Sequence, residues 1–116
     1  MYVDKQGMEI KKSDLLQGTL DLLILKTLAP GPLHGYAIAQ RILLSSRETL
    51  DVQQGSLYPA LHRLERKGLV DSEWKESDNG RMAKFYTLTR TGRKQLTDEL
   101  EQWQRIARSI NWVLES

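Results

Sequence analysis

The chain has 116 residues, of which 40% are hydrophobic and 28% charged, so its size and composition suit one soluble globular domain with a modest core. It has no cysteine, which excludes disulfides and thiolate metal sites and fits a reducing cytoplasm, where we expect it to act. Its net charge is only +2, its longest apolar run (Leu22 to Leu25) is too short to span a bilayer, and its N-terminal residues lack the apolar segment of a signal peptide.

The first part of the chain predicts an arm and a buried helix. Residues 1–12 show no periodicity, so we expect a flexible N-terminal arm, after which Ser13 or Asp14 would cap a helix that runs to Leu28. Leucines cover most of the circumference of this helix, which predicts burial on more than one face. The Pro-Gly-Pro sequence at 30–32 would end it.

A second helix is predicted from about Gly35 to Leu44. Ile38 and Ile42 recur at helical spacing and should face inward. The polar stretch 45–48 is typical of a loop, and residues 49–52 should form a short extended approach to the next helix.

Residues 55–68 predict a short third helix with two opposed faces. The apolar face, which should enter the core, consists of Leu57, Ala60, Leu61 and Leu64. The outer face combines small, hydroxylated and cationic side chains with almost no acid: Gly55, Pro59, His62 and Arg66, flanked by Ser56, Tyr58 and Arg63. Such a face suits a helix in a DNA groove, because small residues allow close approach, hydroxyls meet phosphates and arginine reaches base edges.

The ends of this helix are predicted from its sequence. Ser56 is the expected N-cap, which would place Pro59 in the first turn, where a missing N–H costs little. Gly68 should end the helix in the left-handed conformation. Gln54 lies just before the helix, and its amide could pair with adenine. His62 faces either the groove or only solvent.

Two strand-like runs, 70–75 and 84–88, follow with turn-forming residues at 77–80, which predicts a β-hairpin. Arg81 and Lys84 come after the turn, where a wing that touches DNA needs cations. Trp74 is expected to belong to the core or to cover the sheet. A helix followed by a hairpin is the order of a winged helix-turn-helix, so we predict an α+β, mostly helical fold of this class.

The positive charge of the chain is concentrated in these elements. Residues 54–94 carry nine basic and five acidic side chains, against six and six in residues 1–53 and two and four in residues 95–116. The excess therefore falls where a polyanion would bind. By itself, this imbalance would favour ordinary solvated charge over a binding surface.

A long last helix is predicted from a cap at Thr89 or Thr91 to about Leu114. Its apolar residues recur in steps of four and three, as in a heptad seam: Leu96, Leu100, Trp103, Ala107, Ile110 and Leu114. At 1.5 Å per residue such a helix is about 37 Å long, too long to lie wholly on so small a body. The seam therefore favours dimerisation over packing on its own domain, with a DNA-binding domain at 13–88 and a dimerisation helix at 89–116.

Four stretches of the chain resemble the PadR-like transcriptional regulators. They are LLQGTLDLLIL (15–25), HGYAI (34–38), GSLYPALHRLERKGLV (55–70) and AKFYTLTRTG (83–92). The similarity spans about residues 13–114, and the 55–70 stretch is its most specific part. The single helix after the hairpin resembles the compact branch of the family.

This resemblance implies a homodimeric winged-helix repressor that binds a palindromic operator. In the family the N-terminal and C-terminal helices build the dimer, so Leu16 and Leu20 join the seam as interface candidates. The resemblance also implies contacts of Tyr36, Ser56 and Tyr58 with the DNA backbone, of Arg63 at or near the groove, and of Arg81 and Lys84 from the wing. The DNA-binding candidates are therefore Tyr36, Gln54, Ser56, Tyr58, His62, Arg63, Arg66, Arg81 and Lys84.

The wing departs from the family pattern at its tip. Relatives often carry several consecutive cations there, whereas here Gly80 precedes Arg81 and Met82 follows it. The wing should therefore contribute less to affinity than in those relatives.

Trp103 has two candidate roles. Some relatives bind flat, apolar effectors in an aromatic-lined space at the dimer interface, so Trp103 is a candidate contact for a small aromatic effector. The alternative is that it is only a large interface anchor, since tryptophan is enriched at interface hot spots.

Two other function classes, a protein-binding winged helix and an enzyme, fit the sequence less well. A winged helix can serve protein–protein contact without specific DNA binding, but its outer face would then be expected to be apolar or acidic. An enzyme is disfavoured, because His34 and His62 belong to no metal-binding spacing and no glycine-rich phosphate loop occurs. We expect no catalytic site, no metal site and no cofactor.

Overall fold

A computed structural model describes residues 17–116. Within this range lie four helices and three strands, α1 (Gln17–Leu28), β1 (Leu33–His34), α2 (Gly35–Ser45), α3 (Gln54–Arg66), β2 (Val70–Glu76), β3 (Met82–Leu88) and α4 (Arg90–Glu115). The predicted arm at 1–12, the predicted cap at Ser13 or Asp14, and the interface candidate Leu16 lie outside the described residues. The order of elements confirms the winged helix-turn-helix prediction.

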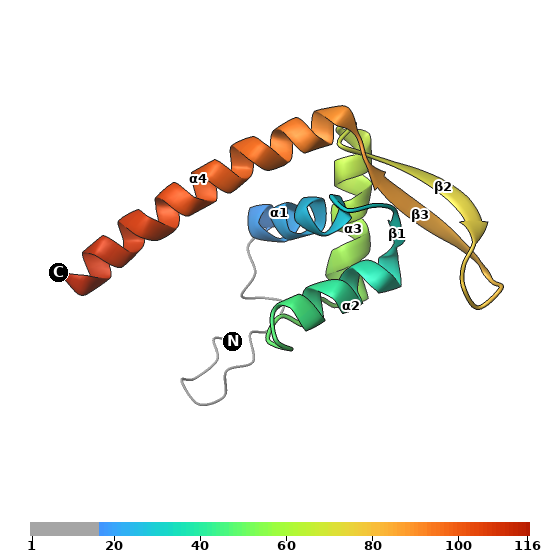
Figure 1. Cartoon of the computed structure of the whole chain (residues 1–116), viewed down its shortest axis with the longest axis horizontal. Helices are drawn as coiled ribbons and strands as arrows, with labels where there is room; N and C mark the ends of the chain where they lie inside the picture. The colour runs from blue at the N-terminus through green and yellow to red at the C-terminus, as the bar shows by residue number, and fades with distance from the viewer. Residues whose placement is uncertain (1–16) are drawn as a thin grey trace.

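Helix α1 lies at the centre of the body and packs against α2, α3 and α4 (Figure 1). Its burial on more than one face is confirmed, since Leu20, Ile24, Leu25 and Leu28 are all at most 5% exposed. The helix ends at Leu28, as the proline-rich stretch predicted. It thus provides the apolar surface on which the other three helices are arranged.

The sheet has the order β1-β3-β2, and both pairs are antiparallel. The β2–β3 hairpin was predicted from the sequence, whereas β1 was not. This two-residue strand pairs Leu33 with Tyr86 and His34 with Phe85 of β3. The edge position of β1 is therefore fixed by residues of β3 that lie more than fifty positions later in the sequence. A strand of two residues is too short to show an alternating pattern of its own.

The N-cap of α3 lies three residues earlier than predicted. Gln53 holds the N-cap position without a side-chain hydrogen bond, so Ser56 lies inside the first turn and does not cap the helix. Pro59 accordingly lies inside the helix, beyond the first turn, where its ring removes the hydrogen bond to the carbonyl of Gly55. Both residues are exposed, so this carbonyl lies on the solvent side of α3.

The predicted end of α3 is confirmed. Gly68 has a φ of +77°, and its N–H donates to the carbonyl of Glu65 at 3.0 Å. The N–H of Leu69 donates to the carbonyl of Leu64 at 2.9 Å, which completes a Schellman motif. The left-handed conformation explains why glycine stands at this position.

Helix α4 starts from the Thr89 cap, whose hydroxyl accepts a hydrogen bond from the N–H of Gly92 at 2.9 Å. The same hydroxyl lies 2.8 Å from the carbonyl of Gly68 and 3.1 Å from that of Leu69, both at the end of α3. The first turn of α4 lies so close to Leu69 that a Cβ on Gly92 would collide with its carbonyl oxygen. The C-terminus of α3 and the N-terminus of α4 therefore form one packed joint.

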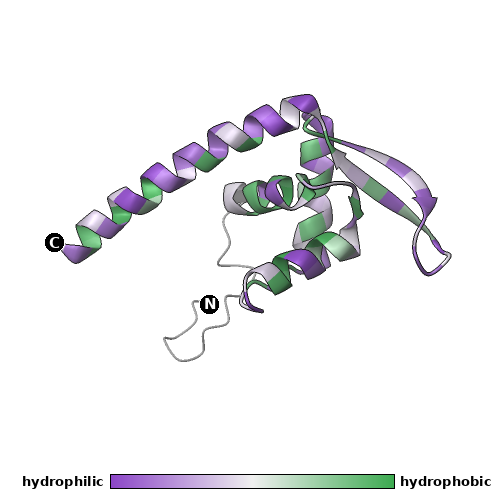
Figure 2. Cartoon of the chain, in the orientation of Figure 1, coloured by the Kyte–Doolittle hydropathy of each residue, from purple (hydrophilic) through white to green (hydrophobic). Residues whose placement is uncertain are grey.

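Beyond this joint, α4 extends away from the body on the side opposite to the hairpin, and the described molecule is 52 Å long (Figure 1). Leu96 still packs against the core, but later apolar residues do not. Apolar residues nevertheless recur to the end of the helix (Figure 2). No helix among residues 17–116 combines the length and the apolar character needed to cross a membrane.

Candidate nucleic-acid interface

The outer face of α3 carries the polar and cationic side chains that the sequence predicted. Gly55, Pro59, His62 and Arg66 are exposed, while Leu57, Ala60, Leu61 and Leu64 on the opposite face are at most 1% exposed. Gln54, in the first turn, is also exposed. The helix thus presents hydrogen-bond donors and a guanidinium to solvent, while its apolar face is fully buried in the core of the chain.

The one acid of α3 is turned away from this face. The carboxylate of Glu65 accepts a hydrogen bond from the hydroxyl of Ser72 at 2.6 Å and lies 3.8 Å from the ammonium of Lys84. Its charge is therefore shared with the hairpin. The exposed stripe of α3 keeps its cation without a competing carboxylate, which suits contact with a polyanion.

Arg63 does not belong to this stripe, and the structure gives no support to its predicted contact with DNA. Its guanidinium forms an ion pair with Asp21 of α1 at 3.0 Å, and its side chain is 23% exposed. Its Nε atom is buried without a hydrogen-bond partner among the described residues. Arg63 and Arg66 were both predicted to contact DNA, and the structure pairs Arg63 with Asp21 but leaves Arg66 exposed.

Asp21 is the partner that holds Arg63 against the core. Asp21 is 7% exposed and lies between two leucines in the sequence of α1. Burial raises the pKa of the Asp21 carboxyl above its ordinary value of 3.8, although the hydrogen bond and charge of Arg63 act in the opposite direction. The pair therefore joins α1 to α3 and fixes where the exposed stripe points.

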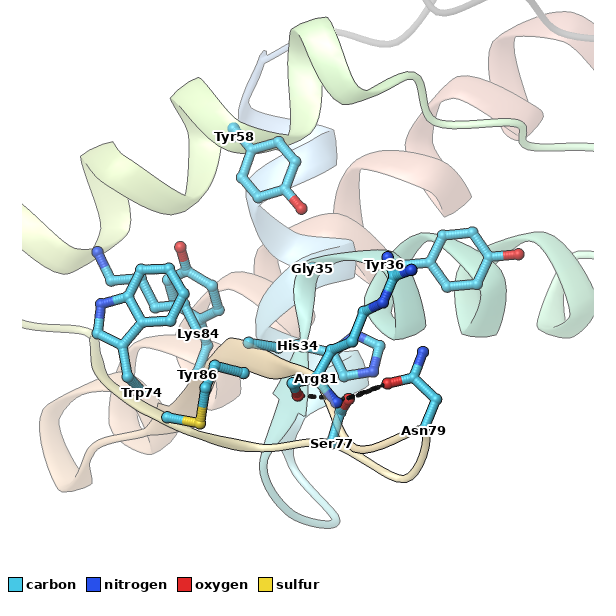
Figure 3. A pocket seen from close by; sticks show the side chains of 12 residues that line it. His34, Gly35, Tyr36, Tyr58, Trp74, Ser77, Asn79, Arg81, Lys84 and Tyr86 are labelled. Carbon is cyan, nitrogen blue, oxygen red and sulfur yellow. Dashed lines mark hydrogen bonds between the residues drawn. The ribbon is translucent and has the colours of Figure 1, made fainter.

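Tyr58 and Tyr36 flank a groove between α3 and the hairpin (Figure 3). Tyr58 is 43% exposed, and its ring lies against the start of α2, where a Cβ on Gly35 would come within 2.5 Å of the phenolic oxygen. Glycine is thus required at position 35 for this close approach. Tyr36 is 61% exposed, and Ser56 is half-buried.

Hydrogen bonds fix the turn of the hairpin, from which the side chain of Arg81 extends. The N–H of Ser77 donates to the carbonyl of Arg81 at 2.7 Å, and the N–H of Arg81 donates to the side-chain oxygen of Asn79 at 3.1 Å. Gly80 has a φ of +83°, as this tight turn requires. The Arg81 side chain is exposed at the tip, whereas Lys84 lies nearer the body and is partly neutralised by Glu65.

The apolar wall of the same groove was not predicted from the sequence. Trp74 was expected in the core or over the sheet, but it is 65% exposed and lines the groove, together with Met82. The signal was present in the strand alternation, because Val70, Ser72 and Trp74 share one face of β2. The sequence did not show that the buried core covers Val70 at one end of this face of β2 and does not reach Trp74.

The comparisons with known proteins agree with this geometry. Residues 24–98 match the model of the transcriptional regulator PadR-like family. This chain belongs to the PadR-like family.

Individual relatives support the assignment. The transcriptional regulator Rv3488 of Mycobacterium tuberculosis is 38% identical over 89 residues, which are 77% of this chain and 79% of that protein. A PadR family regulator of Clostridium difficile R20291 has a similar structure, with a TM-score of 0.71, 31% identity, and coverage of 82% of this chain and 97% of the other. A transcriptional regulator of Clostridium thermocellum gives a TM-score of 0.76 at 30% identity, covering 84% and 95% of the two chains.

Family membership makes this PadR-like chain a DNA-binding transcriptional regulator and confirms the prediction that it is not an enzyme. The single helix α4 after the hairpin places it in the compact form of the family, as predicted. Within residues 17–116, no group of three histidine, aspartate or glutamate side chains could hold a metal ion.

The apolar residues of this PadR-like chain that were predicted to form a dimer interface differ in exposure and fall into three groups. Leu20 is 5% exposed in the core of the chain, so it has little surface left for a partner, and its place in the interface stays a prediction. Leu96, Leu100 and Ala107 are partly buried. The outer residues of α4 are far more exposed, with values from 47% to 75%: Trp103, Ile106, Ile110, Val113 and Leu114.

Proposed function

We propose that this PadR-like regulator is a homodimeric repressor of a palindromic operator, with residues 13–88 as its DNA-binding part and residues 89–116 as its dimerisation helix. The exposed apolar seam of α4 carries this proposal. Trp103 and Ile110 are 47% and 51% exposed on a helix that projects beyond the body (Figure 1). Such a continuous apolar surface favours association with a second protein surface.

A second copy of the chain suits this seam better than another partner does. The apolar residues follow heptad spacing, and identical helices can pair along such a seam around a two-fold axis. Leu100, Trp103, Ala107, Ile110 and Leu114 form the seam in this proposal, and Leu96 lies where it meets the core. The 26 residues of α4 give it about 39 Å of length for this contact.

The proposed dimer would present two copies of α3 to one face of a DNA duplex. Two-fold symmetry in the protein requires half-sites related by the same symmetry, spaced roughly one helical turn, or about 34 Å, apart. Binding of such a dimer over a promoter would block transcription, which is the basis for proposing a repressor. The proposed contacts come from α2, α3 and the wing: Tyr36, Gln54, Tyr58, His62, Arg66 and Arg81.

Two further candidates act differently in this proposal. Ser56 is half-buried in the first turn of α3, so its hydroxyl reaches a phosphate only beside the exposed N-terminal N–H groups of the helix. Lys84 shares its charge with Glu65 and supports the wing from its base. Arg63 is left out, because its guanidinium is held by Asp21.

Selection of bound duplexes from a random pool tests the proposal most directly. We expect one enriched sequence with two inverted half-sites, and affinity for it that falls steeply as salt is raised, because bound cations displace counterions from DNA. A reporter gene carrying this sequence at its promoter should be expressed less when the protein is present. Enrichment of single half-sites without symmetry would contradict the dimeric mode, and higher reporter expression would contradict repression.

The proposal extends to an effector that releases the DNA. A two-fold axis through the α4 seam would bring two Trp103 indoles close together, and a flat aromatic molecule could stack between them. Titration with planar aromatic compounds should then quench Trp103 fluorescence and weaken operator binding. Quenching without any change in operator affinity would leave Trp103 as an interface anchor only.

A further inference from the structure

The groove between α3 and the hairpin has two walls of different character. Tyr58 and the start of α2, at Gly35 and Tyr36, form one wall, and the inner face of the hairpin forms the other (Figure 3). The groove has a volume of about 510 Å³ and is open to solvent. Neither wall is covered by any other part of the described chain.

The hairpin wall is apolar because its inner face continues beyond the core. Val70 and Leu88 pair at the base of this face and are 0% and 5% exposed. Four residues further along β2, Trp74 pairs with Lys84 on the same face and is 65% exposed. Met82, near the tip, is 62% exposed. An indole and a thioether thus lie largely exposed in the groove.

Among the described residues, the side chains that line the groove include two cations and no carboxylate, although Glu76, which pairs with Met82, lies on the same face of the hairpin. The charged side chains of the lining are Arg81 and Lys84, and the phenolic groups of Tyr36 and Tyr58 add hydrogen-bond donors. Glu65 neutralises Lys84 from outside the lining, so Arg81 is its least compensated charge. An occupant that matches this surface has anionic groups and apolar edges in alternation.

The sugar–phosphate backbone of DNA has this chemistry, and the geometry of a winged helix places it here. A helix in the major groove and a wing tip at the adjacent minor groove are separated by one DNA strand. We propose that this strand lies in the groove, with Trp74 and Met82 packed against deoxyribose and with Arg81 and Tyr58 at the flanking phosphates. The inference rests on the proposed DNA-binding mode, and it assigns to Trp74 a role in holding DNA that is independent of base sequence.

Labelling with 5-fluorotryptophan tests the contact directly. The chain has three tryptophans, so the labelled protein should give three ¹⁹F resonances, assigned with the variants Trp74→Phe and Trp112→Phe. A mixed-sequence duplex at low salt is sufficient as the probe, because backbone contacts do not depend on sequence. The Trp74 resonance should shift on addition of this duplex, whereas that of Trp112, which is 67% exposed on the far half of α4, should not.

Affinity measurements provide the second readout. Trp74→Ala should weaken binding to mixed-sequence and selected duplexes alike, by about tenfold, because apolar burial on the indole is lost. Trp74→Phe should recover part of this loss. Trp112→Ala removes an equally exposed indole at a position opposite the seam, and it should change affinity by no more than about twofold.

Three results would overturn the groove assignment while leaving DNA binding intact. They are an unmoved Trp74 resonance in the presence of bound duplex, an unchanged affinity of Trp74→Ala, and a Trp74 resonance that moves with protein concentration alone. The last would place a second copy of the chain in the groove. If neither the native protein nor any variant binds a duplex, the proposed function itself fails.

Discussion

Helices α3 and α4 are both amphipathic, but they satisfy their apolar faces in different ways. In α3 the apolar face is closed within the chain, and Leu57 and Leu61 are completely buried. In α4 most of the apolar residues beyond Leu100 stay exposed, from 47% for Trp103 to 75% for Leu114. The first helix therefore has only its polar face left for a partner, and the second has its apolar face. One chain thus has a polar surface that suits a polyanion and a separate apolar surface that suits another protein.

The largest effect is expected on the free energy of unfolding, to which α3 and α4 should contribute differently. Leu61→Ala should lower the free energy of unfolding by about 2–5 kcal/mol at any protein concentration, because it opens a cavity in a closed core. Leu114→Ala should lower it only at concentrations where the proposed dimer forms. Chemical denaturation at two protein concentrations measures both. A cost for Leu114→Ala that is independent of concentration would show that α4 is stabilised within one chain.

The next effect concerns self-association. Ile110→Asp places a charge in the middle of the α4 seam and should weaken dimerisation by about a hundredfold or more, as expected for loss of a central apolar contact. Analytical ultracentrifugation measures the change. Ser109→Asp, one residue earlier and off the seam, is the matched control and should leave the association constant nearly unchanged. Equal effects of the two variants would contradict the proposed interface.

A smaller effect is expected on DNA affinity. Arg66→Ala removes the exposed guanidinium of α3 and should weaken operator binding by about tenfold, with a shallower salt dependence if the contact is to phosphate. Arg105→Ala removes an equally charged, exposed side chain from the polar side of α4 and serves as the control. Fluorescence anisotropy at two salt concentrations distinguishes them. Similar losses in both variants would reduce the role of α3 to general charge.

The smallest effect is a pH dependence of stability from the Asp21–Arg63 pair. Because burial raises the folded-state pKa of Asp21, the folded chain binds the proton more tightly than the unfolded chain does. The contribution of Asp21 to stability should therefore be greatest below pH 3.8 and fall as the pH rises through the folded-state pKa. Relative to the native protein, Asp21→Asn should gain stability between pH 3 and pH 6, as measured by chemical denaturation. A relative loss over this range would show that the attraction of Arg63 outweighs burial.

Much of this fold could be predicted because its signals are local. Proline and glycine end α1 and α3, alternation marks the hairpin, and Thr89 starts α4. Strand β1 could not be predicted, because its two residues are extended only through pairing with β3. The N-cap of α3 was predicted three residues too late, at Ser56 instead of Gln53, because a favourable capping residue does not oblige a helix to begin there.

The interface was predicted less completely, because it depends on contacts between distant segments. Arg63 and Arg66 are both basic residues of one short helix, and only the presence of Asp21 across the core decides which of them is exposed. Trp74 follows the same alternation as a buried residue, and only the extent of the core shows that it is uncovered. Residue type and periodicity identified the right elements, but long-range packing selected the individual side chains.

The joint between α3 and α4 has a consequence for how operator spacing can evolve. The Thr89 hydroxyl connects the two helices through its hydrogen bonds to the carbonyls of Gly68 and Leu69, and Gly92 leaves no room for a larger side chain between them. In the proposed dimer, the angle between a subunit's DNA-reading helix and its partner-binding helix is thus decided before the subunits meet. Relatives that recognise half-sites at a different separation should differ first at these few positions, even where the residues that touch DNA are the same.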